Sequence, residues 1–572
     1  MKSFRWMVGL TLVLSTAAVL EGCGEAGASA GSGTPPEAAA AASTEPVSGA
    51  ASPLSAGSTQ SSSSSAAAPT PSPPARASFW IPIQESPQSA AAGNNGLYVI
   101  ASNALSSTPA AVMPTTINAG LLAVANQPAA GPEAPTSPMP SLAMYYGTGP
   151  DNNVHIYGVS LADTATLPTA TQIGSLSLNP ASGEHICLAD AAQRDKSVPQ
   201  TLFVIVQITS DSGPFSCGGT GGTYELVNFA DSPGTAPIPL PYSWINITNI
   251  YQSNGELGGL VTLNAASQLV FYPAGQLAGP ATILVDKANS FGPFARSSAA
   301  EYFIVPDPTN QTGEQLYKVT SAGVASLVYS SLGNLGGSSG VVDANNLYFQ
   351  ETQAGILSTI WQASLQSDNV QSLYTLSDGS NPSLIGSTGS VLIYGYSAFN
   401  AAATIATIPV NTVSKTESVL ASFPGNYFSS AFIDSSAAYL YVNYLSAENQ
   451  PGTAAFAVGT GEQLQVSSSS MFVQAGADVL LLSGIATAGT PGGSTIYNFN
   501  PVAATQTPLT LADGSTYTLP QGYSFLTALA SGGIGAINLQ NASGTAATGA
   551  VFDSSTDVIV PLGLANTNVS VW

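Results

Sequence analysis

The sequence predicts an all-β repeat fold that follows an N-terminal export signal and a long linker. Three observations support this prediction. From residue 97 onward, short β-rich segments alternate with Gly, Asn, Asp and Ser turn residues. One class of these segments recurs with a period near 45 residues. No segment has the periodicity of a long amphipathic helix.

The first residues have the three regions of an export signal. Lys2 and Arg5 form a positive region, residues 6–20 form an apolar run, and Leu20-Glu21-Gly22-Cys23 follows. The apolar run is shorter than the roughly 20 residues that a membrane-spanning helix needs. Residues 1–22 are therefore predicted to be a signal peptide.

Leu at −3, Gly at −1 and Cys at +1 make this site resemble the signal of bacterial lipoproteins, with Glu21 as a departure at −2. The resemblance implies that Cys23 carries a lipid anchor that binds the membrane. Gly24 at +2 implies sorting to the outer membrane, either facing the periplasm or at the cell surface. The alternatives are a cleaved secretory signal with a chance cysteine and an uncleaved signal anchor.

Residues 23–77 are predicted to be a disordered linker behind the lipidated cysteine. They consist almost entirely of Ala, Ser, Gly, Pro and Thr, and no aromatic residue occurs between Cys23 and Phe79. Such a composition cannot bury enough apolar surface to offset the entropy of ordering. Phe79-Trp80-Ile81 marks the start of the folded body, residues 78–572.

Three kinds of strand-like segment alternate in the body. The first kind follows an Asn/Asp/Gly turn and occurs at 97–99, 347–349 and 439–441, with a looser copy at 391–394. The second kind occurs at 155–159, 223–227, 315–319, 359–363 and 494–498. The third kind occurs at 326–329 and 372–376. Val569, Val571 and Trp572 are expected to form a closing strand.

The second kind of segment gives the period. Leu316 and Ile360 are 44 residues apart, Ile360 and Ile405 are 45 apart, and longer intervals fit two units or one unit with an insertion. A period near 45 with three or four short strands matches one blade of a β-propeller, which the body resembles in architecture. About eight blades are expected, within a range of seven to nine. The alternative is a β-helix or other β-solenoid, for which this period is long. No sequence signature of a named propeller family occurs.

Composition limits the partners. The chain has 9 Lys and Arg against 31 Asp and Glu, a net charge of −22. Loss of residues 1–22 leaves 7 basic and 30 acidic residues, a net charge of −23. Nucleic acid is therefore not an expected partner. No Lys or Arg follows Lys415, so the last 157 residues cannot supply an arginine clamp for phosphate or carboxylate groups.

Three cysteines fit an exported protein. With Cys23 lipidated, Cys187 and Cys217 are predicted to form a disulfide in an oxidising compartment. The alternative is a metal site that also uses His185, but two thiols and one imidazole leave a zinc ion without a fourth ligand. The metal question therefore stays open at this stage, and no cofactor is expected.

No motif in the body predicts a catalytic residue. Gly336-Gly337-Ser338-Ser339-Gly340 matches G-x-S-x-G but lies in a loop between units instead of between a strand and a helix. The chain has two histidines, His155 in an expected strand and His185 in an expected exposed loop. Asp151-Asn152-Asn153 is either an ordinary turn or a calcium ligand set. Gly218 to Gly222 lacks the βαβ context of a dinucleotide site.

These observations favour a non-enzymatic binding or scaffold lipoprotein of the cell envelope, with a protein or glycan partner. The alternative is a propeller enzyme, a glycan hydrolase or lyase, that acts on an extracellular polymer. Two or more Asp, Glu or His side chains converging on one site would favour the enzyme.

Overall fold

A computed structural model describes the body of the protein. The chain divides into two units, Met1–Ala77 and Ser78–Trp572, and the described residues lie in the second. They comprise residues 79–85 and most of 97–569. The longer gaps are 113–117, 128–138, 149–153, 177–184, 210–222, 229–237, 240–247, 485–492 and 542–546. Between residues 118 and 250 the strands are described, but most of their side chains are not.

The described residues form ten four-stranded sheets and one short 3-10 helix, η1 (Ala274–Gln276). All pairings between the named strands are antiparallel. In the part of the chain that the structure describes, no helix is long and apolar enough to cross a membrane. The all-β, propeller-like prediction is confirmed at this level, and the β-helix alternative is wrong because its strands would pair in parallel.

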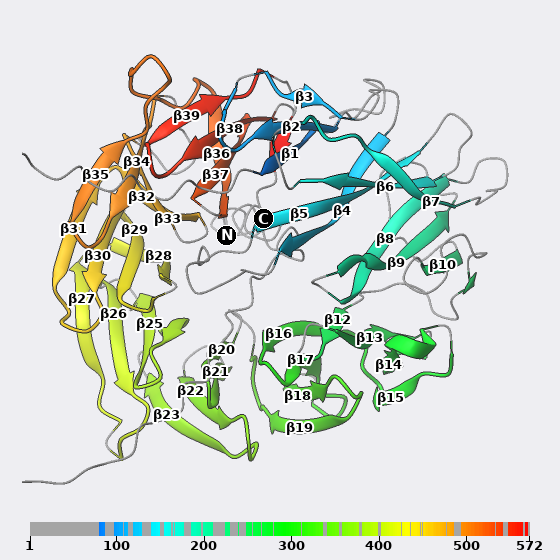
Figure 1. Ribbon diagram of the computed structural model, residues 1–572. Helices are drawn as coiled ribbons and strands as arrows, with labels where there is room; N and C mark the ends of the chain where they lie inside the picture. The colour runs from blue at the N-terminus through cyan, green and yellow to red at the C-terminus, as the bar shows by residue number, and fades with distance from the viewer. Residues whose placement is uncertain are drawn as a thin grey trace, which may run out of the picture. The chain divides into compact units, whose positions relative to one another are not determined.

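Nine of the sheets each use four consecutive strands, which lie side by side in Figure 1. The first five of these sheets contain β4 (Asn118–Gln127), β5 (Met139–Thr148), β6 (Val154–Ser160) and β7 (Thr171–Leu176); β8 (His185–Asp195), β9 (Val198–Thr209), β10 (Thr223–Asn228) and β11 (Ile238–Pro239); β12 (Thr248–Tyr251), β13 (Leu257–Leu263), β14 (Leu269–Pro273) and β15 (Thr282–Val285); β16 (Gly292–Arg296), β17 (Ala300–Pro306), β18 (Glu314–Thr320) and β19 (Ala325–Ser330); β20 (Val341–Val342), β21 (Asn346–Gln353), β22 (Leu357–Ser364) and β23 (Val370–Leu376).

The other four contain β24 (Ser383–Ser387), β25 (Val391–Ser397), β26 (Ala402–Pro409) and β27 (Ser418–Pro424); β28 (Asn426–Ile433), β29 (Tyr439–Ser446), β30 (Pro451–Ala457) and β31 (Gln463–Ser468); β32 (Ser470–Ala475), β33 (Asp478–Ser483), β34 (Thr495–Asn500) and β35 (Thr505–Pro508); β36 (Tyr523–Ser531), β37 (Ile534–Asn541), β38 (Ala547–Asp553) and β39 (Val558–Pro561).

The remaining sheet joins the two ends of the body. Its order is β3 (Ala110–Ala111), β2 (Leu97–Ala101), β1 (Trp80–Glu85) and β40 (Thr567–Val569). Ile83 pairs with Val569, and Glu85 pairs with Thr567. A C-terminal strand is therefore present at Val569, and it completes a sheet that the N-terminal strands begin, whereas Val571 and Trp572 of the expected closing strand lie outside the described residues.

The repeat period is confirmed, but the number of units is not. The second kind of segment forms the third strand of its sheet, as Leu316 in β18, Ile360 in β22 and Ile405 in β26 show. Eight sheets have a third strand of this kind, namely β6, β10, β14, β18, β22, β26, β30 and β34. The described residues form ten. The two further sheets are the sheet shared by the chain ends and the β36–β39 sheet, which follows the last of these third strands.

One assignment of strand position was also wrong. Residues 97–99 share the turn-Leu-Tyr pattern of 347–349, but they lie in β2, the third strand of their sheet, whereas 347–349 lie in β21, a second strand. Local sequence favours a strand after a turn. It does not encode the position of that strand in the sheet, which depends on where its pairing partners lie.

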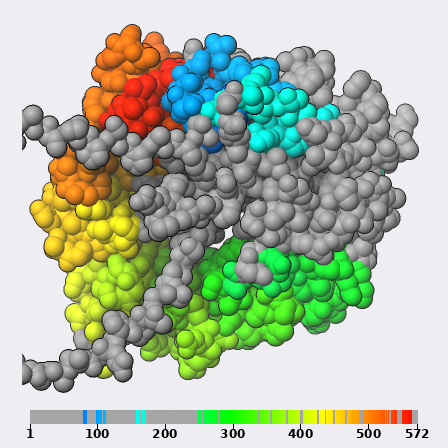
Figure 2. Space-filling view, viewed as in Figure 1, coloured from blue at the N-terminus to red at the C-terminus, as the bar shows by residue number. Residues whose placement is uncertain are grey.

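Apolar side chains of consecutive sheets pack against each other. One cluster joins Tyr348 and Ile360 to Leu392 and Tyr394, and the next joins Ile393 and Ile405 to strands β29 and β30. Similar clusters connect every consecutive pair of sheets from β12–β15 to β36–β39, and then the sheet of β1 and the sheet of β6. The green, yellow and orange surfaces of these segments adjoin in chain order in Figure 2. Each sheet therefore buries its faces only against its neighbours.

Aromatic rings cover glycines on neighbouring strands. Gly535 in β37 pairs with Phe552 in β38, and a Cβ atom on Gly535 would overlap the Phe552 ring. Gly452 in β30 pairs with Tyr444 in β29, and a Cβ atom on Gly452 would likewise overlap the Tyr444 ring. The missing side chain leaves the space that the ring fills, which is a known use of glycine in strands.

We predict that Gly535→Ala destabilises the body by about 1–3 kcal/mol, because the fully buried Phe552 has no free space into which it can shift. Urea unfolding of the body measures the effect. Gly275→Ala is the matched control, since a Cβ there meets no atom within 4 Å. Equal stability of the Gly535 variant and the wild type would contradict this account of the packing.

Candidate functional site

Polar side chains connect neighbouring sheets, and these contacts locate the polar sites of the molecule. Glu351 in β21 is the most buried carboxylate among the described residues, with 1% of its surface exposed. Its Oε1 accepts hydrogen bonds from Ser331 Oγ (2.5 Å) and from the Leu332 N–H (3.1 Å). Its Oε2 accepts from Tyr329 Oη (2.8 Å) and from Trp361 Nε1 (3.1 Å). Three of these four donors come from the preceding sheet or the loop after it.

The four hydrogen bonds decide the protonation state of Glu351. Burial by itself raises the pKa of a carboxyl group, but the hydrogen bonds from Ser331, Tyr329 and other donors outweigh it and lower the pKa of Glu351 below its ordinary value of 4.5. Because every one of these hydrogen-bond partners of Glu351 is a donor, the site favours the ionised carboxylate over a neutral side chain. Glu351 therefore serves to hold two sheets together.

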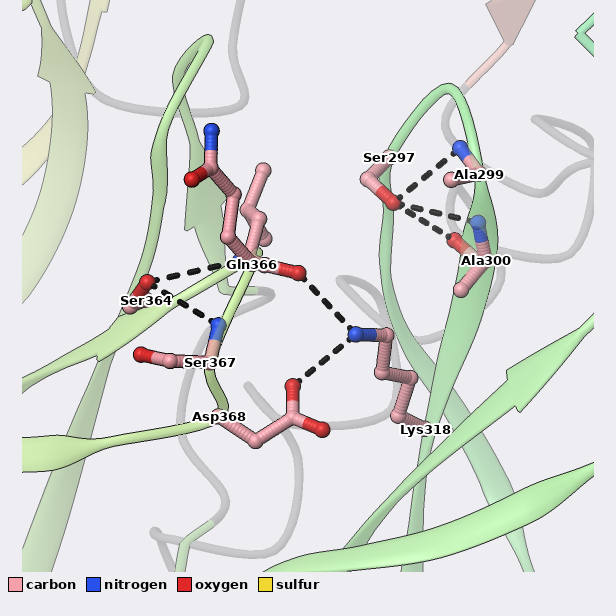
Figure 3. A network of polar contacts seen from close by, with 9 residues as sticks. Ser297, Ala299, Ala300, Lys318, Ser364, Gln366, Ser367 and Asp368 are labelled. Atoms are coloured by element: carbon pink, nitrogen blue, oxygen red, sulfur yellow. Dashed lines mark hydrogen bonds and ion pairs between the residues drawn. The ribbon is translucent and has the colours of Figure 1, made fainter.

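The same two sheets are joined by an ion pair (Figure 3). Lys318 Nζ in β18 lies 2.9 Å from Asp368 Oδ1 and donates to the Leu365 carbonyl oxygen at 3.0 Å, both in the turn after β22. Asp368 has a left-handed backbone conformation, with φ of 54°. In the same view Ser364 Oγ accepts from the backbone N–H groups of Gln366 and Ser367. The hydrogen bonds to Ser364 Oγ thus fix the turn in the conformation that binds Lys318.

Asp343 has a similar role at the next interface. Its Oδ1 accepts from the N–H groups of Asn345 and Asn346 (both 2.8 Å), and its Oδ2 accepts from Tyr348 Oη (2.7 Å) and Ser387 Oγ (3.0 Å). Ser387 belongs to the next sheet. Burial raises the pKa of Asp343, but these hydrogen bonds exceed that effect and lower it.

Serine and asparagine side chains make the later connections. Ser397 Oγ accepts from the Phe428 N–H (2.7 Å). The Asn443 amide binds both backbone groups of Phe472, donating to its oxygen (3.0 Å) and accepting from its nitrogen (2.8 Å). Asn498 Nδ2 donates to Asp557 Oδ1 (2.9 Å) and to the Ser554 carbonyl oxygen (3.1 Å). Each hydrogen bond of this kind adds about 1 kcal/mol to stability and fixes the register of neighbouring sheets.

A cleft between two of these sheets is the candidate functional site. It lies between the β28–β31 sheet and the β32–β35 sheet and has a volume of about 270 Å³. We call it the sheet-interface cleft. Its walls are formed by Asp434, Tyr441, Asp478, Val479, Asn498, Phe499, Asn500 and Pro501. Two carboxylates, two amides and one phenol therefore line a single small space.

Local structure places each of these groups. Asp434 follows β28 and holds the turn to β29, because its Oδ1 accepts from the Tyr439 N–H (2.8 Å) and its Oδ2 accepts from Ser436 Oγ. Asp478 is the first residue of β33. Asn498 and Asn500 alternate along β34, the third strand of the same sheet as Asp478. Together with Tyr441 in β29, the cleft thus combines one turn residue with residues of three strands.

Tyr441 is the least satisfied group in the wall. Its side chain is fully buried in β29, and its hydroxyl has no hydrogen-bond partner among the described residues. Burial, with a smaller contribution from the charge of Asp434, raises the pKa of the Tyr441 hydroxyl well above its ordinary value of 10. Leaving such a hydroxyl without a partner costs about 1–3 kcal/mol.

The structure describes only some of the residues singled out in the sequence. Cys23 and Cys217 lie outside the described residues. Cys187 lies in β8 and pairs with Gln207, so the Cys187–Cys217 disulfide stays a prediction. His155 lies in β6 as expected. His185 is the first residue of β8, so its assignment to a loop was wrong.

The short motifs of the sequence do not contribute to the cleft. Residues 151–153, 218–222 and 336–339 lie outside the described residues, and Val341–Val342 after the last of them forms β20 as expected. Where side chains are described, no three His, Cys, Asp or Glu residues come together in a way that could hold a metal ion.

Sequence reasoning missed the cleft because its residues are ordinary turn and strand residues. In the sequence, residues 439–441 are a strand signal after a turn, and no residue from Asp434 to Tyr441 indicates a binding site. Nothing in the local pattern shows that Asp478 and Asn498, 44 and 64 positions after Asp434, face the same space.

Comparisons with known proteins give no family. No family profile and no curated protein matches the chain. Solved structures with a similar course of the chain include a eukaryotic initiation factor, with 10% identity over 76% of this chain and 95% of the other and a TM-score of 0.44. Prolyl oligopeptidase B from Galerina marginata shows 10% identity over 76% of this chain and 55% of its own, with a TM-score of 0.34.

An oligogalacturonate lyase in complex with manganese is also similar, with 11% identity over 65% of this chain and 95% of the other and a TM-score of 0.30. The chain spans about half the length of the prolyl oligopeptidase. At these identities and TM-scores the likenesses give no information about function.

We predict that Glu351→Gln lowers the unfolding free energy at pH 7 by about 1–3 kcal/mol, because the amide nitrogen would face a hydrogen-bond donor. The folded pKa of Glu351 lies below 4.5, so its contribution is present above that pH and is lost as the pH falls through the lower folded value. The difference between variant and wild type should therefore narrow below about pH 4.5.

Urea unfolding at several pH values between 3 and 7 measures this difference. Glu462→Gln serves as the control, because Glu462 is exposed. A constant difference across the pH range would contradict the role given to the Glu351 carboxylate.

Proposed function

We propose that this protein is a lipoprotein of the cell envelope whose propeller-like body is a non-enzymatic binding module. Cys23 carries the lipid anchor, residues 24–77 are the linker, and the body binds its partner away from the membrane. The observation that carries the proposal is the sheet-interface cleft, where two carboxylates, two amides and the ring of Tyr441 line one space. Ligand sites in proteins are clefts in which a small number of polar groups fix the orientation of the ligand.

We also propose that the ten sheets are the blades of a closed propeller. The pairing of β1 with β40 and the packing of each sheet on the next support this arrangement. Contacts of β8 and β9 with β4, and of β13 with β8, support it on the side of the early sheets. In a closed ring both faces of every sheet pack on a neighbouring sheet, and the width of the clefts between sheets is fixed. An experimental structure in which β40 lies apart from β1 would contradict it.

A propeller enzyme acting on an extracellular glycan is the second candidate. It is favoured by one observation, the presence of Asp434 and Asp478 in the same cleft, because glycoside hydrolysis uses paired carboxylates. The test is an assay for reducing ends released from a panel of bacterial and plant polysaccharides. Release by the wild-type protein that is lost in the Asp478→Asn variant would establish an enzyme instead of a binding module.

Binding can be tested with the purified body, residues 78–572. We predict that at least one compound from a panel of neutral sugars, amino sugars, amino acids, amines and glycan fragments raises its melting temperature. The double variant Asp434→Asn with Asp478→Asn should lose this shift while it still unfolds cooperatively. A panel without any stabilising compound, or equal shifts in both proteins, would count against the cleft as a binding site.

The anchor has its own test. Cys23→Ser should move the full-length protein from the membrane fraction to the soluble fraction, because several acyl chains on one cysteine give stable membrane binding and their loss removes it. The control is Cys217→Ser, which leaves Cys23 intact. Retention of the Cys23 variant on washed membranes would overturn the lipoprotein assignment. Peptide mapping of the exported protein without reduction tests the Cys187–Cys217 disulfide.

A further inference from the structure

We infer that the body docks on a neutral lipid bilayer through apolar side chains exposed at one end of its sheets. This inference rests on the lipid anchor proposed above, because the anchor keeps the body beside a bilayer. It concerns a different set of residues from those that line the sheet-interface cleft. Three features support it: the position of the exposed apolar side chains, the point where the linker joins the body, and the charges around the loops.

The two ends of each sheet differ in the loops that they carry. In a sheet of four consecutive antiparallel strands, the turn between the first two strands and the loop between the last two lie at the same end. Backbone hydrogen bonds connect them: the Val410 N–H donates to the Ser390 carbonyl oxygen (2.9 Å), and the Val458 N–H donates to the Ala438 carbonyl oxygen (2.8 Å). We call this end of the sheets the tip face.

The tip faces of neighbouring sheets from β16 to β39 lie side by side. The contacts between them are made by Lys318 with Asp368, Asp343 with Ser387, Gly386 with Ile433, and Asn498 with Asp557. The sheet-interface cleft lies at the same end, between the β28–β31 and β32–β35 sheets. The tip faces of these sheets therefore form one side of the body.

Most of the exposed large apolar side chains lie on the tip face. Of the ten among the described residues, four lie in loops between a third and a fourth strand, and three lie near the start of a fourth strand. The loop residues are Leu167, Val324, Val413 and Val502, the strand residues are Ile283, Leu327 and Val419, and the other three are Leu332, Leu357 and Tyr427. A concentration of this kind favours an apolar partner on that side.

The three valines are the most regular part of this set. Val324 and Val502 are 62% and 81% exposed, and Val413 is fully exposed. They follow one another at intervals of 89 residues, which is two repeat units. Apolar tips therefore recur on every second sheet, spread over one side of the body, as a flat partner such as a bilayer surface requires.

The linker joins the body at the tip face. Strand β1 runs antiparallel to β2, so its first residues lie beside the loop that follows β2. The Ser102 N–H in that loop donates to the Phe79 carbonyl oxygen (2.8 Å). The Trp80 N–H donates to the carbonyl oxygen of Leu161 (2.7 Å), which begins the loop that carries Leu167. A tether attached here leaves the tip face free to reach a bilayer without passing around the body.

The loops of the three valines carry little charge that would oppose contact with lipid. Residues 321–324 and 501–504 include no charged residue. Beside Val413, the Lys415 ammonium group donates to a backbone carbonyl oxygen of its own loop, and the Glu417 carboxylate accepts from two tyrosine hydroxyls. Both charged groups are thus bound within the protein, and the valine remains the exposed side chain of its loop.

The lipid headgroups must be neutral. The chain has a net charge of −22, and the exposed Glu462 lies in the β30–β31 loop of the same face, so anionic lipid repels the body. A few valines bury little area, so docking depends on a tether that keeps the body close to the bilayer. Because the cleft lies at the tip face, docking covers it, and the body binds its partner when it has left the bilayer.

Tryptophan fluorescence of the tethered protein tests the inference. Residues 24–572 with an N-terminal hexahistidine tag are bound to phosphatidylcholine vesicles that contain a nickel-chelating lipid, so that the outcome does not depend on lipidation of Cys23. We expect brominated phosphatidylcholine to quench the added fluorescence of Val413→Trp and of Val502→Trp. Leu332→Trp is the matched control, because Leu332 is 73% exposed in the loop after β19, at the opposite end of its sheet.

The wild-type protein gives the background of the native tryptophans, and release of the tag with imidazole should abolish the quenching. Replacing part of the phosphatidylcholine with phosphatidylglycerol should reduce it. Absence of quenching at positions 413 and 502, or equal quenching at position 332, would overturn the docking surface. Equal quenching in both lipid mixtures would overturn the preference for neutral lipid.

A further set of variants tests whether the tips act together. Val324→Trp should be quenched by brominated lipid, and this quenching should fall when Val413→Asp and Val502→Asp are added, because the two charges oppose docking of the whole face. Unchanged quenching at position 324 would contradict a shared docking surface. The binding function of the cleft is measured in solution without vesicles, so failure of the docking surface leaves that function untouched.

Discussion

A four-stranded sheet has two faces, and in this protein each face is buried only where the next sheet packs on it. The apolar clusters run from one sheet into the next, so no sheet has a core of its own. Removing one interface would expose apolar surface to water, which costs roughly 25 cal/mol of folding free energy per Å². The sheets at the two ends of the chain must therefore also be covered. The pairing of β40 with β1 meets this requirement by building one sheet from both ends of the body.

The scarcity of charge shapes how these interfaces are fixed. With charged residues at 7% of the chain, few ion pairs can form, and Lys318 with Asp368 is one of them among the described residues. Elsewhere a serine, an asparagine or a carboxylate surrounded by donors joins one sheet to the next, as Ser397, Asn443 and Glu351 do. These contacts depend little on salt, and they need short, well-defined distances that packed sheets supply.

The sheet-interface cleft combines carboxylates with a buried polar group that lacks a partner. At the interfaces of Glu351 and Asp343, several donors converge on one carboxylate, and at the cleft the buried Tyr441 hydroxyl has no hydrogen-bond partner among the described residues. The fold thus carries an unfavourable contribution at a place where several acceptors face a small open space. Retained strain or unsatisfied polarity in an otherwise well-satisfied structure is a frequent feature of binding sites.

The sequence by itself determined the strand content, the 45-residue period and the third strands from β6 to β34, because turn residues and short β-rich segments are local signals. The count of ten sheets required the tertiary structure, since one sheet is divided between β1–β3 and β40, which come from opposite ends of the body. The cleft was equally out of reach of the sequence. Asp434, Tyr441, Asp478 and Asn498 belong to two different sheets, and only the packing of those sheets brings residues so far apart in the chain around one space.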